Sequence, residues 1–161
     1  MTAQEQIRVR PAVRADVGAI VGLWQEMMEE HGALDPRFRF APRASREFER
    51  HIQESIRCRE SRVLAAEWGG ILAGYTLGEL HTRKPLYPAG VYGFISDLCV
   101  DRPFRRRGIG RALVEELLDW FRQRGATAVE LLAAEANPDS RAFWAAMGFS
   151  DFLRLMRREI E

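Results

Sequence analysis

The most constraining feature of the sequence is an apolar run, a loop rich in glycine and arginine, and an amphipathic run in direct succession. Residues 94–100 (FISDLCV) have the composition of a buried strand. Residues 101–111 (DRPFRRRGIGR) follow, and we call them the cradle loop. Residues 108–124 then repeat apolar side chains at helical spacing, namely Leu113, Leu117, Trp120 and Phe121. This succession predicts a strand, loop and helix unit of an α/β domain.

The cradle loop has the chemistry of an anion site. The start of a helix exposes unpaired N–H groups with a partial positive charge, and glycine lets an anion approach the backbone closely. Gly108 and Gly110 lie at this helix start, and five arginines surround them: Arg102, Arg105, Arg106, Arg107 and Arg111. We therefore interpret the loop as a binding site for pyrophosphate.

Two other kinds of phosphate loop fit this segment poorly. A Walker loop needs GxxxxGK followed by Ser or Thr, and the sequence has no such string; its one lysine is Lys84. A dinucleotide-binding GxGxxG would need a third glycine or alanine where Leu113 stands. The pattern that remains is RxxGxG, from Arg105 to Gly110.

The apolar pattern elsewhere predicts the other elements. Strands are expected at residues 7–10, 62–67, 71–80, 94–100, 129–133 and 151–158. Trp68, Gly69 and Gly70 predict a hairpin turn, and the two strands around the central helix predict a right-handed parallel crossover. Asp16 and Ser45 can cap two helices near the N-terminus. The fold class is α/β, one domain over residues 1–161, with a mixed central sheet flanked by about four helices.

A second motif lies at residues 137–149 (NPDSRAFWAAMGF). Asn137 can cap a helix with Pro138 at its first position, and Gly148 can end it. With the RxxGxG string after a buried strand, this segment resembles the GNAT superfamily of N-acetyltransferases, through Asn137, Phe143, Gly148 and Phe149. The resemblance covers residues 7–156 and departs from the family at Trp144, where many members have a tyrosine.

The resemblance implies that acetyl-CoA is the acyl donor and that an amine attacks its thioester directly. The pyrophosphate would be held by Arg105, Arg106, Arg107, Gly108, Ile109, Gly110 and Arg111. The pantetheine and acetyl carbonyl would lie along Leu98, Cys99 and Val100, and the CoA arm would contact Asn137 and Phe143. The acceptor would be a small primary amine or a protein or peptide amino group, with candidate contacts at Phe38, Arg39 and Phe40. These three can equally belong to a solvated basic loop.

The reaction would need a base, because an amine with a pKa of about 10.4 is almost fully protonated at pH 7. Glu79 and Asp97 are the candidates, Glu79 slightly preferred, and either can instead be a structural carboxylate. Trp144 cannot act as the acid for the departing thiolate that a tyrosine would provide. Tyr92, Tyr87 or a bound water could replace it.

Composition limits the other functions. With 24 basic and 23 acidic residues among 161, we expect no nucleic-acid partner. No stretch approaches the roughly 20 apolar residues of a membrane span, and the histidines and cysteines have no metal-ligand spacing, so we expect no membrane and no metal. Two distant cysteines and a polar N-terminus favour the cytoplasm. A homodimer, a longer acyl-CoA as donor, and a CoA-binding sensor or assembly subunit without turnover are the alternatives left open.

Overall fold

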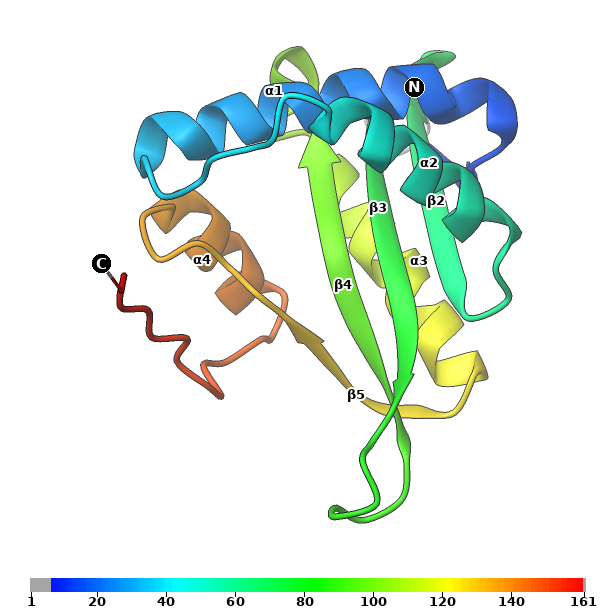
Figure 1. Cartoon of the computed structure of the whole chain (residues 1–161). Helices are drawn as coiled ribbons and strands as arrows, with labels where there is room; N and C mark the ends of the chain where they lie inside the picture. The colour runs from blue at the N-terminus through cyan, green and yellow to red at the C-terminus, as the bar shows by residue number, and fades with distance from the viewer. Residues whose placement is uncertain (1–6, 161) are drawn as a thin grey trace.

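The chain folds around a five-stranded mixed sheet whose strands lie in sequence order, as the computed structural model of residues 7–160 shows. The strands are β1 (Ile7–Pro11), β2 (Ser61–Trp68), β3 (Ile71–Thr82), β4 (Val91–Val100) and β5 (Ala126–Leu131). The first four pair antiparallel, and β5 pairs parallel with β4 (Figure 1). The mixed sheet and the parallel crossover expected from the sequence are confirmed.

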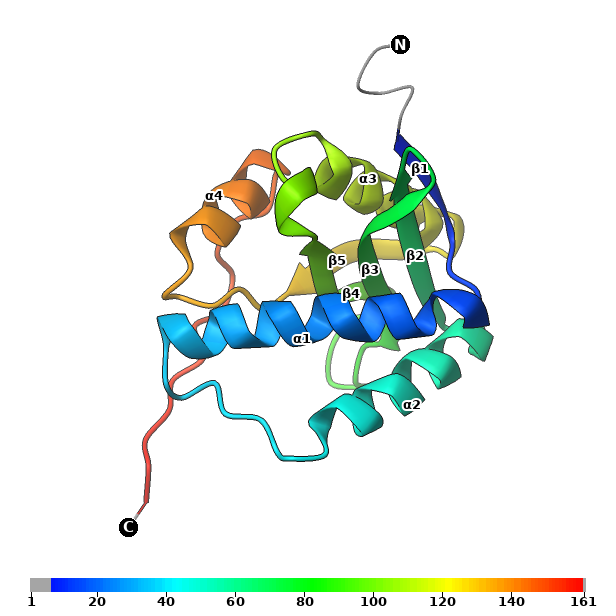
Figure 2. The same cartoon turned by 90° about the horizontal axis from the view of Figure 1, so that it is seen from above.

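Two helices cover each face of the sheet (Figure 2). On one face lie α1 (Val17–Leu34) and α2 (Ala44–Arg57), and on the other lie α3 (Ile109–Gln123) and α4 (Pro138–Ala146). Each layer has its own apolar core, because strand side chains alternate between the two faces. Among residues 7–160, no helix combines the length and apolarity that crossing a bilayer requires.

Glycines let α3 approach the sheet closely. A Cβ atom on Gly78 of β3 would lie 2.7 Å from the ring of Phe121 and 2.8 Å from Leu117. A Cβ on Gly93 of β4 would lie 2.6 Å from the same ring. All three distances are shorter than the contacts that real Cβ atoms make, so side chains at these two positions would push α3 away from the sheet.

The predicted turns and helix starts are mostly confirmed. Gly69 and Gly70 have φ of +57° and +85°, as a two-residue hairpin turn requires. Asn137 accepts a hydrogen bond at 3.1 Å from the Ser140 N–H and so caps α4. Asp16 precedes α1, but its carboxylate accepts hydrogen bonds from Arg10 and from the Val13 N–H rather than from the helix.

The prediction that Ser45 caps the second helix is wrong. α2 begins at Ala44, after Arg43, so Ser45 already lies within its first turn. The Ser45 hydroxyl instead accepts a hydrogen bond from the Gln25 amide of α1 at 2.8 Å. A contact between two helices has replaced the local cap.

The predicted last strand at residues 151–158 is also wrong. Residues 150–160 form no strand, and Phe152, Leu153, Leu155 and Met156 are 76–85% exposed. The apolar residues come in adjacent pairs rather than in alternation, so a strand here could not turn them all toward one face. The fifth strand also lies earlier than expected, at Ala126–Leu131 rather than 129–133, because the chain enters β5 directly after the left-handed Gly125.

We predict that Gly78→Ala lowers the free energy of unfolding by about 1–3 kcal/mol, because the added methyl group overpacks the contact with Phe121. Gly22→Ala is the matched control: it lies within α1, and its Cβ would meet nothing within 4 Å. That control should leave stability unchanged or raise it by up to about 1 kcal/mol. Urea unfolding of both variants makes the comparison, and equal stabilities would contradict the close packing of α3.

Candidate functional site

The two parallel strands, β4 and the edge strand β5, diverge at the end where the cradle loop begins. β4 pairs with β5 between Val91 and Ile95, and no residue of the described chain pairs with Ser96–Val100 on that side. A β-bulge at Ser96 accompanies the change, since Leu77 is opposite Asp97 while Gly78 is already opposite Ile95. We call the diverging ends of β4 and β5 the fork, and Figure 1 shows β5 running away from β4 there.

The backbone of Leu98 and Val100 points into the fork. The Asp101 N–H donates to the Ala73 carbonyl of β3, and successive residues of a strand turn their backbone groups to opposite sides. Val100 therefore faces away from β3, and Arg105 Nε indeed donates to its carbonyl at 2.9 Å. Leu98, two residues earlier, faces the same way. Of the three predicted lining residues, Leu98 and Val100 thus present backbone to the fork.

Cys99 is placed differently. Its side chain is 5% exposed, packs in the core beneath α1, and its thiol donates to the Leu23 carbonyl at 3.4 Å. Burial raises the pKa of this thiol to about 12. Cys99 is thus held as a neutral thiol, which is the form that does not act as a nucleophile.

The cradle loop reaches α3 through unusual backbone conformations. Arg106 has a φ of +64° and is the one non-glycine residue of residues 7–160 with a positive φ. Gly108 follows with a φ of +88° and directly precedes α3. Such conformations cost a non-glycine residue about 1–2 kcal/mol and are typical of backbone turns that bind anions. Space over Gly108 is open, since a Cβ there would meet only Ile7, at 3.8 Å.

The arginines of the loop do not all surround its glycines. Arg102 and Arg105 reach across to Glu30 of α1, with distances from 2.6 to 3.1 Å. Arg107 lies over the Trp68 ring at 5.0 Å, and Arg111 pairs with Glu115 on the exposed face of α3 at 3.5 Å. Arg106 makes no ion pair within the described chain. The five arginines therefore do not surround the glycines as expected. Two of them, Arg102 and Arg105, instead fix the loop to Glu30.

Glu30 is the anchor of this loop and was missed from the sequence. Burial opposes ionisation of its carboxyl group, but hydrogen bonds from Arg105 and Arg102 outweigh burial and hold its pKa below the ordinary value. The residues lie 72 and 75 positions apart in the chain, so no local pattern could have paired them.

The two candidate bases lie on the face that α1 and α2 cover. Glu79 of β3 accepts a hydrogen bond from the Ser96 hydroxyl at 2.7 Å, and His81 Nε2 lies 4.0 Å from its carboxylate. Asp97 is more deeply placed. Burial raises its pKa to about 6; the charge of Glu79 adds to this, and His51 and His31 oppose it.

Tyr75 adds a polar group that the sequence did not single out. Its side chain is fully buried, and its hydroxyl has no hydrogen-bond partner within the described chain. Burial, and then the negative charge of Asp97, hold its pKa well above the ordinary value. A neutral phenol beside Asp97 is a hydrogen-bond donor without an acceptor.

The loop between α1 and α2 is pinned by its aromatic side chains. Phe40 packs edge-on against Trp24 at 5.7 Å, and Phe38 lies 5.3 Å from the ring of His31. Arg39 Nε donates to the Pro36 carbonyl at 3.1 Å. His31 Nδ1 is 2.8 Å from the Met27 carbonyl, so that nitrogen carries the proton and Nε2 is left free.

The second motif joins the fork from α4. A Cβ on Gly110 would lie 3.4 Å from the ring of Phe143 and 3.7 Å from Val100, so Phe143 lies between the start of α3 and the end of β4. Trp144 is 9% exposed and packs edge-on between Phe143 and Phe149. Its indole is a core side chain and does not line the fork.

The tyrosines considered as replacement acids lie at the wrong end of β4. Tyr92 stacks on His81, eight residues before Val100, which is roughly 26 Å along a strand. Tyr87 is 61% exposed in the loop before β4. Neither can reach the fork. In residues 7–160, no group of three or more His, Cys, Asp and Glu side chains is placed to hold a metal ion.

We predict that Glu30→Gln frees the cradle loop without unfolding the protein. Loss of a partly exposed ion pair should cost about 0–1 kcal/mol of stability. The amides of residues 102–107 should then exchange hydrogen faster, while those of β2 and β3 remain protected. Hydrogen exchange measured by mass spectrometry tests this, with Glu29→Gln, an exposed neighbour, as control. Unchanged exchange in the loop would mean that Glu30 is not its anchor.

Comparisons with known proteins agree with this architecture. The family model described as the acetyltransferase (GNAT) family matches residues 23–149. An L-2,4-diaminobutyric acid acetyltransferase from Nocardia farcinica is 35% identical over 92 residues, which are 56% of this chain and 45% of that protein. An alanine N-acetyltransferase of ribosomal protein bS18 from Escherichia coli is 33% identical over 55 residues, 34% of this chain and 37% of that one. The chain thus spans less than half the length of these two curated relatives.

Solved structures show the same fold at low identity. A mutant BH1408 protein from Bacillus halodurans superposes with a TM-score of 0.87 at 22% identity, over 96% of this chain and 99% of that chain. An aminoglycoside N-acetyltransferase in complex with CoA gives a TM-score of 0.72 at 17% identity, over 96% and 94% of the two chains. With most of its length matched by the family model and the same fold in these structures, the chain belongs to the GNAT family of acetyltransferases.

Proposed function

We propose that this protein transfers an acetyl group from acetyl-CoA to a primary amine. The observation that carries the proposal is the position of the cradle loop: a left-handed turn at Arg106 and Gly108 leads into the N-terminus of α3 beside the open end of β4. Unpaired N–H groups of a helix start favour phosphate, and the fork offers backbone next to them.

The residues present fit CoA. The backbone N–H groups from Arg106 to Gly110 would hold the pyrophosphate, with the side chains of Arg106 and Arg111 nearby; the Arg105 N–H already donates to the Arg102 carbonyl. The left-handed Gly108 and the space above it suit a close anion, because a larger side chain would fill that space. Phe143 and Asn137 would border the pantetheine arm from α4, although the side-chain oxygen Oδ1 of Asn137 already caps that helix.

Acetyl-CoA supplies an activated acyl group as a thioester. The part of this chain is to polarise the carbonyl, and the N–H groups of Leu98 or Val100, which point into the fork, are suited to donate to it. A donor fixed in this way typically contributes about 3–4 kcal/mol to a developing oxyanion.

Asp97 is the base that the geometry supports best. At pH 7 only about one amine in 2,500 with a pKa of about 10.4 is unprotonated, so a base must accept the proton. Asp97 has a pKa of about 6 and is therefore ionised at neutral pH, yet basic enough to accept a proton. Glu79 binds the Ser96 hydroxyl, and we assign it to positioning the bulge.

The leaving thiolate needs no strong acid. A thiol with a pKa of about 8.5 leaves readily near neutral pH, so water can protonate it. Trp144 nevertheless favours a second candidate, a CoA-binding sensor or assembly subunit without turnover, because its buried indole cannot supply a proton. A longer acyl-CoA as donor stays an alternative within the same site.

The class of the acceptor is a proposal that we base on the substrates of the relatives. Their substrates, by name, are a diamino acid, an alanine of a ribosomal protein and aminoglycosides, all of which carry primary amines. The carboxylates of Asp97 and Glu79 would attract such cations. We therefore propose a small amine or a peptide amino group.

Dimerisation also stays a prediction. The reason to test it is that the apolar side chains of the C-terminal segment are exposed.

Release of free thiol from acetyl-CoA, measured against a panel of polyamines, amino acids, aminoglycosides and peptides, tests the function. The melting temperature is followed with and without acetyl-CoA. Release above the background without amine supports the enzyme. Stabilisation without release for any amine supports the sensor, and no stabilisation at saturating acetyl-CoA contradicts both.

We predict that Gly108→Glu abolishes acetyl-CoA binding while the protein stays folded, because a carboxylate and its side chain would occupy the phosphate position. Gly18→Glu, on the exposed side of α1, makes the same change of charge where a Cβ meets nothing within 4 Å. Calorimetry should show binding for the control and none for Gly108→Glu. Equal affinities would disprove the role of the cradle loop.

We predict that the dependence of kcat/KM on pH shows the ionisation of Asp97. For an amine with a pKa near 10, log kcat/KM should rise with a slope of about 1 below pH 6 and level off above it, because ionised Asp97 takes its proton from the protonated amine. Asp97→Asn should lower kcat by about 100-fold or more and remove the break near pH 6. Glu79→Gln should retain it. A break that disappears with Glu79→Gln instead would reverse the assignment.

A further inference from the structure

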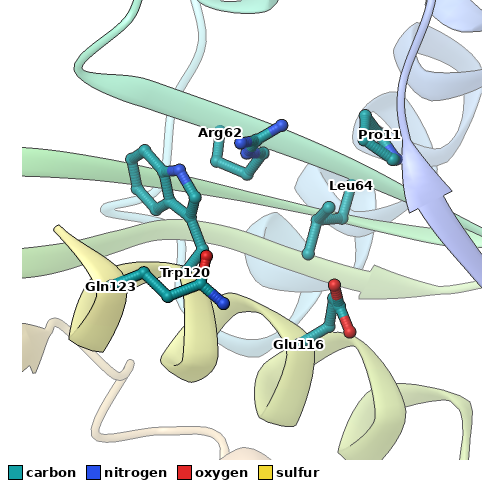
Figure 3. A pocket seen from close by; sticks show the side chains of 6 residues that line it. All are labelled: Pro11, Arg62, Leu64, Glu116, Trp120 and Gln123. Atoms are coloured by element: carbon teal, nitrogen blue, oxygen red, sulfur yellow. The ribbon is translucent and has the colours of Figure 1, made fainter.

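Two adjoining hollows lie at the end of the molecule opposite the cradle loop. The first, of about 200 Å³, lies between β1, β2 and α3, and Figure 3 shows the side chains that line it. The second, of about 270 Å³, continues toward the end of α2 and the turn into β2. Pro11 and Arg62 line both hollows, so the two are neighbours.

The lining of these hollows is strongly basic. Four arginines line them against one carboxylate, that of Glu116; we call them the arginine cluster, and they are Arg57, Arg59, Arg62 and Arg124. Ion pairs formed by residues 7–160 involve none of the four. By contrast, Arg102 and Arg105 are both held by Glu30. The cluster thus concentrates four positive charges near one carboxylate, and none of the four forms an ion pair within residues 7–160.

Trp120 holds two members of the cluster in place. The guanidinium carbons of Arg62 and Arg124 lie 5.4 and 5.6 Å from the centre of the indole, which is 7% exposed. A contact between a guanidinium group and the face of an aromatic ring is favourable, and it restricts the arginine side chain in the folded protein. These two cations are therefore partly ordered before any ligand arrives, which lowers the cost of binding.

The ends of two helices account for only part of this charge. Arg57 ends α2, and Arg124 follows α3, where the carbonyl groups of a helix C-terminus favour a cation. Arg59 and Arg62 lie beyond α2, in the turn and at the start of β2, and have no such partner. Their charges point to a ligand.

We propose that the arginine cluster binds the phosphate group of a small molecule. A guanidinium group matches two phosphate oxygens at once, and phosphate supplies up to two negative charges to four cations. Each hollow by itself, at about 200 and 270 Å³, is below the range of about 300–1,000 Å³ that larger ligands fill, so a group of the size of a phosphate suits either one. Because α3 separates the cluster from the cradle loop by roughly 22 Å, one phosphate cannot reach both.

The experiment is a calorimetric titration of the whole chain with inorganic phosphate and with glycerol 3-phosphate at constant ionic strength. Arg59→Gln with Arg124→Gln should weaken binding at least tenfold. The matched control is Arg46→Gln with Arg154→Gln, which removes the same charge from exposed positions elsewhere and should bind as the unchanged protein does. Gly108→Glu should also bind phosphate normally, whatever its effect on acetyl-CoA, so the inference stands or falls independently of the proposed function.

Cys58 provides a second, local readout. It lines the second hollow and is an exposed free thiol, whereas Cys99 is buried. Saturating phosphate should slow its reaction with iodoacetamide in the unchanged protein and leave the rate unaltered in the arginine double variant. Tighter binding of glycerol 3-phosphate would assign a phosphate ester, and equal affinity would assign phosphate itself.

Three results would overturn the inference. They are no binding up to about 10 mM phosphate, an equal loss of affinity in the two double variants, and a loss of phosphate binding in Gly108→Glu. The melting temperatures of all variants show whether each is folded.

Discussion

The contact between α3 and the sheet determines where everything else in the site can lie. Phe121 and Leu117 rest on the backbone of Gly78 and Gly93, at a distance that no Cβ would allow. The helix is thereby held in one position, with its start beside the end of β4. The loop that joins them must then turn sharply, and Arg106 and Gly108 adopt left-handed conformations to do so. Close packing at one end of α3 therefore accounts for strained backbone at the other.

The bulge at Ser96 divides β4 into two parts with different neighbours. Before it, the strand pairs on both sides; after it, one side is open toward β5. The alternation of the strand then gives its two faces different chemistry. Backbone and apolar side chains of Leu98 and Val100 lie toward the fork and α3, while Asp97 lies beneath α1 and α2. An acyl donor and an amine acceptor could thus approach the same short stretch from opposite sides.

Local patterns in the sequence predicted the local structure well. The strand, cradle loop and helix, the Gly69–Gly70 hairpin and the Asn137 cap depend on residues close together in the chain, where spacing and conformational preference decide the outcome. Contacts between distant residues were not predictable in this way. Arg102 and Arg105 were expected at a phosphate and bind Glu30 instead, and Ser45 binds Gln25 rather than its own helix.

The same limit explains the remaining differences. The apolar pairs at residues 152–156 suggested a strand, but a strand forms only where a partner is in register, and no segment of the described chain pairs with the outer edge of β5. The sequence favoured Glu79 only slightly over Asp97, since both belong to apolar strand segments. Their surroundings separate them: the half-buried carboxylate of Asp97 lies near an unpartnered phenol, and that of Glu79 accepts a hydroxyl hydrogen bond.

The position of Glu30 has a thermodynamic consequence. It lies one turn before the end of α1, and the loop that follows that helix borders the face where Asp97 and Glu79 lie. The Glu30 carboxylate therefore anchors the cradle loop to α1, the helix that leads into the loop beside Asp97 and Glu79. Any ligand that shifts Glu30 from one side changes the free energy of binding on the other, and linkage requires the effect to be equal in both directions. Through this residue, each co-substrate can influence the affinity of the other by a route that does not depend on their direct contact.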